Sequence, residues 1–225
     1  MTEIKSFHDV VRSRRSARSF LPDPVSQDII LSVLDDARRA PSNSNVQPWV
    51  VHIVSGDARD RLSRALIEAA TAEKFTFDFP FSYDGLYGPY KDRQQAQGAG
   101  YFTAAGIGRE EIEQRNYAIM KNLEFFGAPH VCLMFMAPVY DEARLAGDLG
   151  MFGQTFLLSL TAHNLSGCPQ TLLSLFADTI RESLDIDPAY KMLFGISFGH
   201  AEPDNPVNLY PLDKAGVSEF ATFHQ

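Results

Sequence analysis

The stretch DLGMFGQTFLLSLTAHNLSGCPQ, residues 148–170, decides the fold of this 225-residue chain. Its first part is apolar over several helical turns and continues a pattern that begins near residue 143, which predicts a long helix over 143–164. GCPQ at 167–170 ends that helix and predicts a short strand or turn. A long apolar helix followed by a short strand is typical of a chain that packs helices against a sheet.

Working outward, three apolar runs predict buried strands at 49–54, 130–137 and 190–198. Helical spacing of apolar residues predicts helices at 3–12, 27–40, 58–73, 90–105, 109–126 and 177–184. Ser26 and Asp57 are the expected N-caps of the second and third of these helices. The pattern predicts an α+β fold, with helices around a small apolar sheet, in one domain over 1–225. The tail over 201–225 has no strong periodicity.

Composition excludes several classes of function. The net charge is −8 and the sequence pI is about 5.2, which argues against nucleic-acid binding and against docking on anionic lipid. The longest apolar run, over 131–139, is too short to span a bilayer. The chain holds two cysteines, and its first residues lack the apolar core of a secretion signal. We therefore expect a cytoplasmic protein that binds neither membrane nor nucleic acid.

The charge is unevenly distributed. Residues 145–225 hold three cations and nine acids, whereas four arginines without an acid lie within seven residues near the N-terminus: Arg12, Arg14, Arg15 and Arg18. Guanidinium groups bind phosphate oxygens in pairs, and Ser16 and Ser19 add hydroxyl donors. This segment is the first candidate for an anion site, and a solvated basic patch is the alternative.

A second polar segment is APSNSNVQPWVV, residues 40–51. Its amide and hydroxyl side chains offer both donors and acceptors, which suit the edge of a flat heterocycle. The alternative is a turn whose residues were chosen for their backbone preferences.

Aromatic residues alternate with other types between 75 and 90, at Phe75, Phe77, Phe79, Phe81 and Tyr83. A period of two is typical of a strand, and Pro80 restricts that strand to an edge or an extended loop. One interpretation places this aromatic face in the core. The other makes the segment a lid over an aromatic ligand, with a substrate pocket formed by Phe79, Phe81, Tyr83 and Tyr87.

Other motifs are weaker. GISFG at 195–199 matches the nucleophile elbow of hydrolases, but the residues after it cannot form the helix that the elbow requires. Neither a G-x-G-x-x-G nor a Walker A motif is present. The six histidines are scattered without metal-ligand spacing, so we expect no metal, and His52 and His130 lie in apolar runs typical of the core.

RRSARSF (14–20), APSNSNVQPW (40–49), NLEFFGAPHVCLMF (122–135), the stretch at 148–170 and GHAEPDNPVN (199–208) occur in this order. Together they resemble the FMN-dependent nitroreductase family, and most closely its nitrobenzoate-reductase-like branch. The resemblance covers nearly the whole chain. It implies a nitroreductase-like fold, in which a small mixed sheet is wrapped by helices, and an intertwined homodimer with FMN at the subunit interface.

The resemblance also implies roles for individual residues. The phosphate, ribityl and pyrimidine side of FMN would be held by Arg14, Arg15, Ser16 and Arg18. The partner subunit would line the ring with Pro41, Ser42, Asn43, Asn45 and Gln47. The isoalloxazine face would pack on Pro169, Gln170 and Thr171, with a backbone N–H near Thr171 donating to N5. Helix 148–164 would form the dimer core, and the tail over 201–225 would reach over the other subunit.

The implied reaction is a ping-pong transfer of two electrons. NAD(P)H reduces FMN and leaves, and a nitroaromatic or quinone-like acceptor takes its place. The cofactor carries the chemistry, so no side chain need be catalytic. The alternatives are another flavin chemistry on the same fold, such as reductive dehalogenation or flavin reduction, and a flavin-binding protein without turnover.

The tail departs from the family pattern. Leu209 and Pro211 stand where relatives of this branch commonly carry arginines that help bind the phosphate, and Lys214 is a partial substitute. Losing one charge-assisted contact costs about 1.5–3 kcal/mol. We therefore expect FMN to bind, with more of its phosphate contacts made by Arg14 and Arg15.

Overall fold

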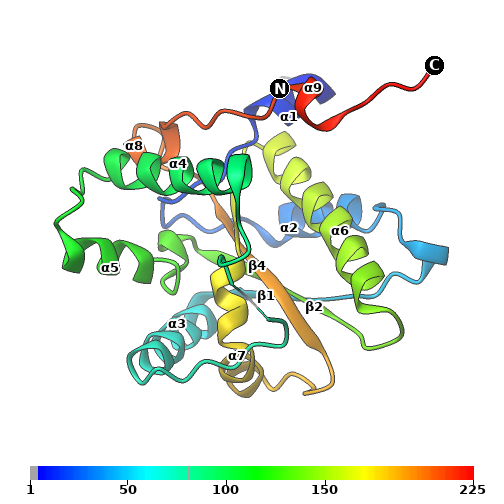
Figure 1. Ribbon diagram of the computed structural model, residues 1–225. Helices are drawn as coiled ribbons and strands as arrows, with labels where there is room; N and C mark the ends of the chain where they lie inside the picture. Colours follow the sequence, from blue (N-terminus) through cyan, green and yellow to red (C-terminus); the bar gives the residue numbers. More distant parts are fainter. Residues whose placement is uncertain (1–4, 81) are drawn as a thin grey trace.

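The computed structural model describes residues 5–80 and 82–225, and its centre is a four-stranded sheet (Figure 1). The strands are β1 (Trp49–Ser55), β2 (His130–Met136), β3 (Ser166–Gln170) and β4 (Lys191–Gly199), in the order β1-β2-β4-β3. All three pairings are antiparallel, whereas the resemblance implied a mixed sheet. Parallel pairing in the described ranges is limited to isolated bridges, such as Ser16 with Gly167, because the arginine segment touches the edge strand at a single residue.

Helices cover both faces of the sheet (Figure 1). One face is covered by α2 (Gln27–Ala37) and α6 (Glu142–Ala162), and the other by α3 (Gly56–Thr71) and α7 (Ala177–Leu184). Beyond them lie α4 (Gly88–Ala104) and α5 (Ile112–Met120). This arrangement confirms the predicted α+β class.

The central strand β2 shows why the chain folds this way. Every residue of the strand is buried. Val131, Leu133 and Phe135 pack into the cluster beneath α3 and α7, whereas Cys132 and Met134 pack into the cluster beneath α2 and α6. Because successive side chains of a strand point to opposite faces, a strand between two helical layers must be apolar at every position.

The long helix predicted over 143–164 is α6. Asp141 caps it by accepting a hydrogen bond from the N–H of Arg144. A Cβ atom at Gly153 would lie 2.8 Å from the ring of Phe194, so this glycine lets the helix approach the sheet closely.

Three local predictions need comment. Ser26 caps α2 as expected, accepting a hydrogen bond from the N–H of Ile29. Asp57 lies in the first turn of α3 rather than at its cap, because the helix already begins at Gly56 after Ser55. The helix predicted over 109–126 is shorter: α5 ends at Met120, and the chain then turns into a 3-10 helix, η2 (Phe125–Gly127).

The first helix is α1 (Phe7–Ser13), capped by Ser6, and residues 3 and 4 of the predicted helix lie outside the described residues. Val10 is buried, whereas Phe7 and Val11 are exposed. The tail forms two short helices, α8 (Pro206–Leu209) and α9 (Val217–Phe220). In the part of the chain that the structure describes, no helix is long and apolar enough to cross a membrane.

The aromatic segment over 75–90 is anchored by an ion pair as well as by aromatic contacts of Phe75 and Phe79. Asp78 accepts two hydrogen bonds from the guanidinium of Arg181 on α7, at 2.8 and 3.0 Å, and a third from the N–H of Met192. Phe75 and Phe77 are about half exposed. The interpretation in which one aromatic face enters the core is therefore wrong for Phe75 and Phe77, whereas Phe79 packs against the core cluster beneath α2 and α6.

Candidate cofactor site

The arginine segment lies along the edge of the sheet. Arg14 ends α1, Ser16 forms a bridge with Gly167 of β3, and the N–H of Ala17 donates to the carbonyl of Gly167 at 3.4 Å. Ala17 is buried and anchors the backbone, while the side chains of Arg14, Ser16 and Arg18 are half-buried. The segment is thus a fixed strip of backbone that carries cations at the protein surface.

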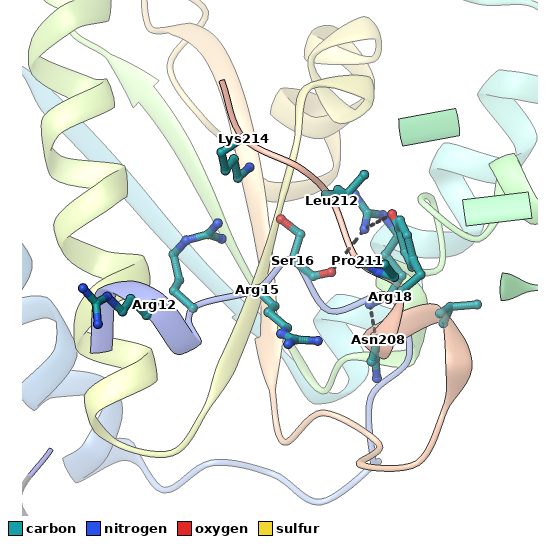
Figure 2. A pocket seen from close by; sticks show the side chains of 11 residues that line it. Arg12, Arg15, Ser16, Arg18, Asn208, Pro211, Leu212 and Lys214 are labelled. Atoms are coloured by element: carbon teal, nitrogen blue, oxygen red, sulfur yellow. Dashed lines mark hydrogen bonds between the residues drawn. The ribbon is translucent and has the colours of Figure 1, made fainter. Parts of the chain in front are cut away.

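These cations line one cavity with a volume of about 350 Å³ (Figure 2). Its walls are the N-terminal segment and the tail, and the residues are Arg12, Arg14, Arg15, Ser16, Arg18, Val207, Asn208, Tyr210, Pro211, Leu212 and Lys214. Five of the eleven are cations and none is an acid. The side chains of Arg12 and Arg14 enter no ion pair or hydrogen bond within the described ranges. The cavity therefore suits a multiply charged anion.

Arg18 is the most firmly held of these arginines. Its guanidinium donates to the hydroxyl of Tyr210 at 2.8 Å and to the carbonyl of Ser16 at 3.2 Å. It also lies 5.7 and 5.8 Å from the ring centroids of Tyr101 and Tyr210. The side-chain oxygen of Asn208 accepts from the backbone N–H of Arg18 at 2.7 Å. The tail thus contributes to the site by holding an arginine in place.

The tail also clarifies the departure seen in the sequence. Leu209 and Pro211 carry no charge, but the carbonyl of Leu209 accepts a hydrogen bond from Arg15 at 3.4 Å. Lys214 lines the anion cavity, as expected for a partial substitute (Figure 2). It is exposed, so its contribution to anion binding is weaker than that of a buried guanidinium.

A second cavity, of about 420 Å³, adjoins the first at Arg18. Its walls come from α4, η2, β3 and the turn after β3, and include Pro169, Gln170 and Thr171. Tyr101, Phe102, Phe126, Leu172 and Leu175 add apolar surface. A cationic cavity beside a mostly apolar one, with Arg18 in the walls of both, suits a ligand with a charged end and a flat aromatic end.

Gln170 forms part of this wall with its amide turned into the protein. The amide nitrogen donates to the backbone carbonyl of Asn122 at 2.9 Å, and the amide oxygen accepts from the hydroxyl of Ser197. Gln170 can therefore serve a ligand through its backbone only. Ser197 is fully buried, which excludes the exposed nucleophile of the hydrolase interpretation.

Cys168 lies behind the same wall. Burial raises the pKa of its thiol to about 11, and the charges of Arg18 and Arg14 act in the opposite direction. The thiol is therefore neutral at physiological pH, so it is no nucleophile.

The polar segment over 41–47 lines neither cavity. It lies between α2 and β1, on the other side of the chain from α4 and α8 (Figure 1). Four of the five residues expected here, Pro41, Asn43, Asn45 and Gln47, are exposed, and Ser42 is half-buried. Within one chain the structure therefore does not bring this segment to the arginines.

The four residues predicted for the substrate pocket lie in different places. Tyr83 lines the second cavity. Phe79 packs against the cluster beneath α2 and α6, with the ammonium of Lys191 5.7 Å from its ring centroid. Tyr87 is 72% exposed at the start of α4, and Phe81 lies outside the described residues.

Sequence reasoning missed Tyr101, Asn208 and Tyr210. Asn208 and Tyr210 flank Leu209 in the tail, and no local pattern marks either of them as a contact of the arginine segment. Tyr101 carries no local signal beyond its place near Gly100, where a Cβ atom would lie 3.0 Å from the ring of Tyr210.

Comparison with known proteins identifies the family to which the chain belongs. Residues 11–200 match the Nitroreductase family, and the chain belongs to this family. Nitroreductase NfnB of Mycolicibacterium smegmatis is 42% identical over 214 residues, which cover 95% of this chain and 91% of the relative. The 4-nitrobenzoate reductase of Pseudomonas putida is 33% identical over 217 residues, which cover 96% and 95%.

Solved structures agree. The FMN-dependent nitroreductase NfnB from Mycobacterium smegmatis in complex with NADPH superposes with a TM-score of 0.93 at 40% identity, covering 97% of each chain. The FMN and NADPH-dependent nitroreductase NfnB from Sphigopyxis sp. strain HMH gives a TM-score of 0.94 at 26% identity, covering 98% of this chain and 100% of the other. The predicted family and the nitroreductase-like fold are confirmed.

Proposed function

We propose that this protein is an FMN-dependent oxidoreductase that uses NAD(P)H to reduce nitroaromatic or quinone-like acceptors. One observation carries the proposal: a cavity with five cations and no acid shares Arg18 with a second cavity whose lining is mostly apolar. The relatives named above include FMN- and NADPH-dependent nitroreductases and a 4-nitrobenzoate reductase, which supports the same chemistry here.

The residues present fit FMN. Its phosphate monoester carries between one and two negative charges at neutral pH, which match the guanidinium groups of Arg12 and Arg14 in the walls of the cavity. Ser16 adds a hydroxyl donor beside them. The apolar walls of the second cavity suit a flat ring system. Arg14, Arg15, Ser16 and Arg18 would hold the phosphate, ribityl and pyrimidine side, and Pro169, Gln170 and Thr171 the ring.

When bound, FMN supplies a two-electron centre that accepts hydride from NAD(P)H and passes it to the acceptor. The protein's residues would bind and orient the cofactor. Arg18, fixed by Tyr210 and two aromatic rings, places a permanent positive charge where the two cavities meet. A cation there favours negative charge on the pyrimidine side of the ring and so favours its reduced state. The buried Ser197 and the neutral thiol of Cys168 take no part as nucleophiles.

The acting form in this proposal is a homodimer. The segment over 41–47 is exposed and far from the arginines of its own chain, so a second copy would bring its amides to the ring. Large apolar side chains are exposed on α1, α6 and the tail, among them Phe7, Met151, Phe220 and Phe223. An exposed apolar surface of this kind is typical of an interface. The tail over 201–225 would reach the partner, and the protein would act in the cytoplasm.

The test begins with the visible spectrum of the purified protein. We expect a flavin spectrum, present on purification or after addition of FMN, that is bleached anaerobically by NADH or NADPH and restored by a nitroaromatic acceptor. A colourless protein that takes up no FMN would contradict the proposal. A bound flavin that neither nucleotide bleaches would identify a flavin-binding protein without turnover.

The oligomeric state is tested separately by light scattering. A mass near 50 kDa, twice the 25.1 kDa of one chain, is expected, and a monomer that still binds FMN tightly would contradict the shared site.

A further inference from the structure

The interior of α6 contains an unusual residue, Asp148. It is 3% exposed, and it is the single carboxylate among the buried side chains of the described residues. None of the ion pairs found in residues 5–80 and 82–225 includes it. A buried carboxylate is costly unless its oxygens accept strong hydrogen bonds, so the partners of Asp148 are informative.

Asp148 accepts hydrogen bonds from two groups. One carboxylate oxygen accepts from the backbone N–H of Asn43 at 3.0 Å, and the other accepts from the hydroxyl of Tyr140 at 3.3 Å. Asn43 begins the polar segment over 43–47, which is 105 residues earlier in the chain than its partner. The buried acid thus ties an exposed loop to the core of the molecule.

That loop has a strained backbone. Ser44, Asn45 and Gln47 have φ angles of 50°, 58° and 51°, in the left-handed region that residues with a side chain rarely adopt. Within the loop, the N–H of Gln47 donates to the hydroxyl of Ser42 at 2.9 Å. Such conformations persist where the surrounding contacts hold them, and they concentrate at ligand-binding sites.

The loop is held firmly and yet faces outward. Its own bonds and the bond to Asp148 engage the backbone N–H groups of Asn43, Asn45, Val46 and Gln47. The side chains of the same four residues are exposed. This is the arrangement expected of a preformed binding surface whose ligand comes from outside the chain.

We infer that Asp148 is a positioning residue, which fixes the loop over 43–47 so that its amide side chains meet the flavin ring bound by the partner subunit. The inference rests on the proposed function for the identity of the ligand. The anchoring of the loop by Asp148 is independent of that function and can be measured without flavin.

The experiment compares Asp148→Ala and Asp148→Asn by hydrogen exchange and FMN titration of the full-length protein. Alanine removes the acceptor, whereas asparagine keeps an oxygen that can accept from Asn43. Loss of a hydrogen bond to a charged acceptor corresponds to an increase of about ten- to a hundredfold in the equilibrium constant for local opening. We expect the amides of Asn43, Asn45, Val46 and Gln47 to exchange faster by that factor in the alanine variant, and the asparagine variant to recover most of the protection.

Ser159→Ala is the matched control. Ser159 is also buried on α6, and its hydroxyl donates to Asp36 on α2 at 2.6 Å, so this variant weakens the helix packing but not the loop anchor. Amides in the middle of α6 should keep their protection in the Asp148 variants. The dissociation constant for FMN should rise about tenfold or more in Asp148→Ala and much less in Ser159→Ala.

The outcomes separate the two claims. Loop exchange that does not change in Asp148→Ala, or that rises equally in Ser159→Ala, would overturn the anchoring. Faster loop exchange with an unchanged FMN dissociation constant would overturn the positioning role. A wild-type protein that binds no FMN would refute the proposed function, and the exchange data would still decide whether Asp148 anchors the loop.

Discussion

The double variant Arg14→Ala, Arg18→Ala removes the two half-buried guanidinium groups of the anion cavity and gives the sharpest test of the cofactor site. The two residues differ in their present contacts. The guanidinium of Arg14 has no partner among the described residues, so its removal leaves no group of the protein unsatisfied. Arg18 donates to Tyr210 and to the carbonyl of Ser16, so its removal also frees part of the tail.

The expected magnitude follows from these contacts. A charge-assisted hydrogen bond to phosphate contributes about 1.5–3 kcal/mol, and each 1.4 kcal/mol is tenfold in the dissociation constant. Loss of Arg14 alone should weaken FMN binding by about ten- to a hundredfold. Loss of both arginines should weaken it by at least about a hundredfold, because Lys214 is exposed and replaces little of the lost attraction.

Quenching of flavin fluorescence on binding measures the dissociation constant, and the flavin content after purification gives an independent value. Arg38→Ala is the control, since Arg38 forms an exposed ion pair with Asp35 and lines neither cavity. Raised salt should weaken binding in the wild type more than in the double variant, which has fewer cations to screen. Unchanged FMN binding in the double variant, with a native circular dichroism spectrum, would refute the assignment of this cavity to the phosphate.

Three further predictions concern stability and the tail. Arg181→Ala should lower the free energy of unfolding by about 2 kcal/mol, measured with urea, because it leaves the half-buried carboxylate of Asp78 without its counter-charge; a loss below about 1 kcal/mol would contradict this. Burial lowers the pKa of His130, so below about pH 6.5 the unfolded chain binds more protons than the folded protein, and the free energy of unfolding should fall as the pH decreases. His130→Asn should reduce this dependence of the free energy of unfolding on pH. Equal dependence in the wild type and the variant would exclude His130 as its source. Gly100→Ala should weaken FMN binding several-fold by displacing Tyr210, whereas Gly85→Ala, which has open space around it and lines neither cavity, should not; equal effects would show that the contact with Tyr210 is unimportant.

Much of the fold could be predicted because it depends on local patterns. The apolar run at 130–137 and the helical stretch at 143–164 each express one periodicity, and the structure has β2 and α6 at these places. The prediction of a helix over 109–126 was wrong beyond Met120, because tertiary packing there outweighs the local helical pattern. Phe125 and Phe126 have positive φ angles that end helical geometry, and both are buried, so core packing stabilises a turn that propensity disfavours.

The candidate site also has parts that local sequence patterns predict and parts that they do not. The four arginines are close in sequence, so their charge alone predicted an anion site, and the structure gathers them around one cavity. Asn208 and Tyr210 contact Arg18 across about 190 residues, and no local pattern encodes such a contact. The role proposed for the loop over 41–47 would depend on a second chain, which no pattern within one chain can locate.

The tail shows how uncharged contacts can take the place of an additional charge in such a site. Of the three cations in residues 145–225, Lys214 alone reaches the anion cavity. The tail instead supplies uncharged groups that hold a cation from elsewhere: the oxygens of Asn208 and Tyr210 accept from the backbone and the guanidinium of Arg18. A fixed arginine loses less side-chain entropy when it binds an anion, so immobilising Arg18 recovers part of the affinity that an additional arginine would contribute. The neutral tail at Leu209 and Pro211 is therefore compatible with a working phosphate site.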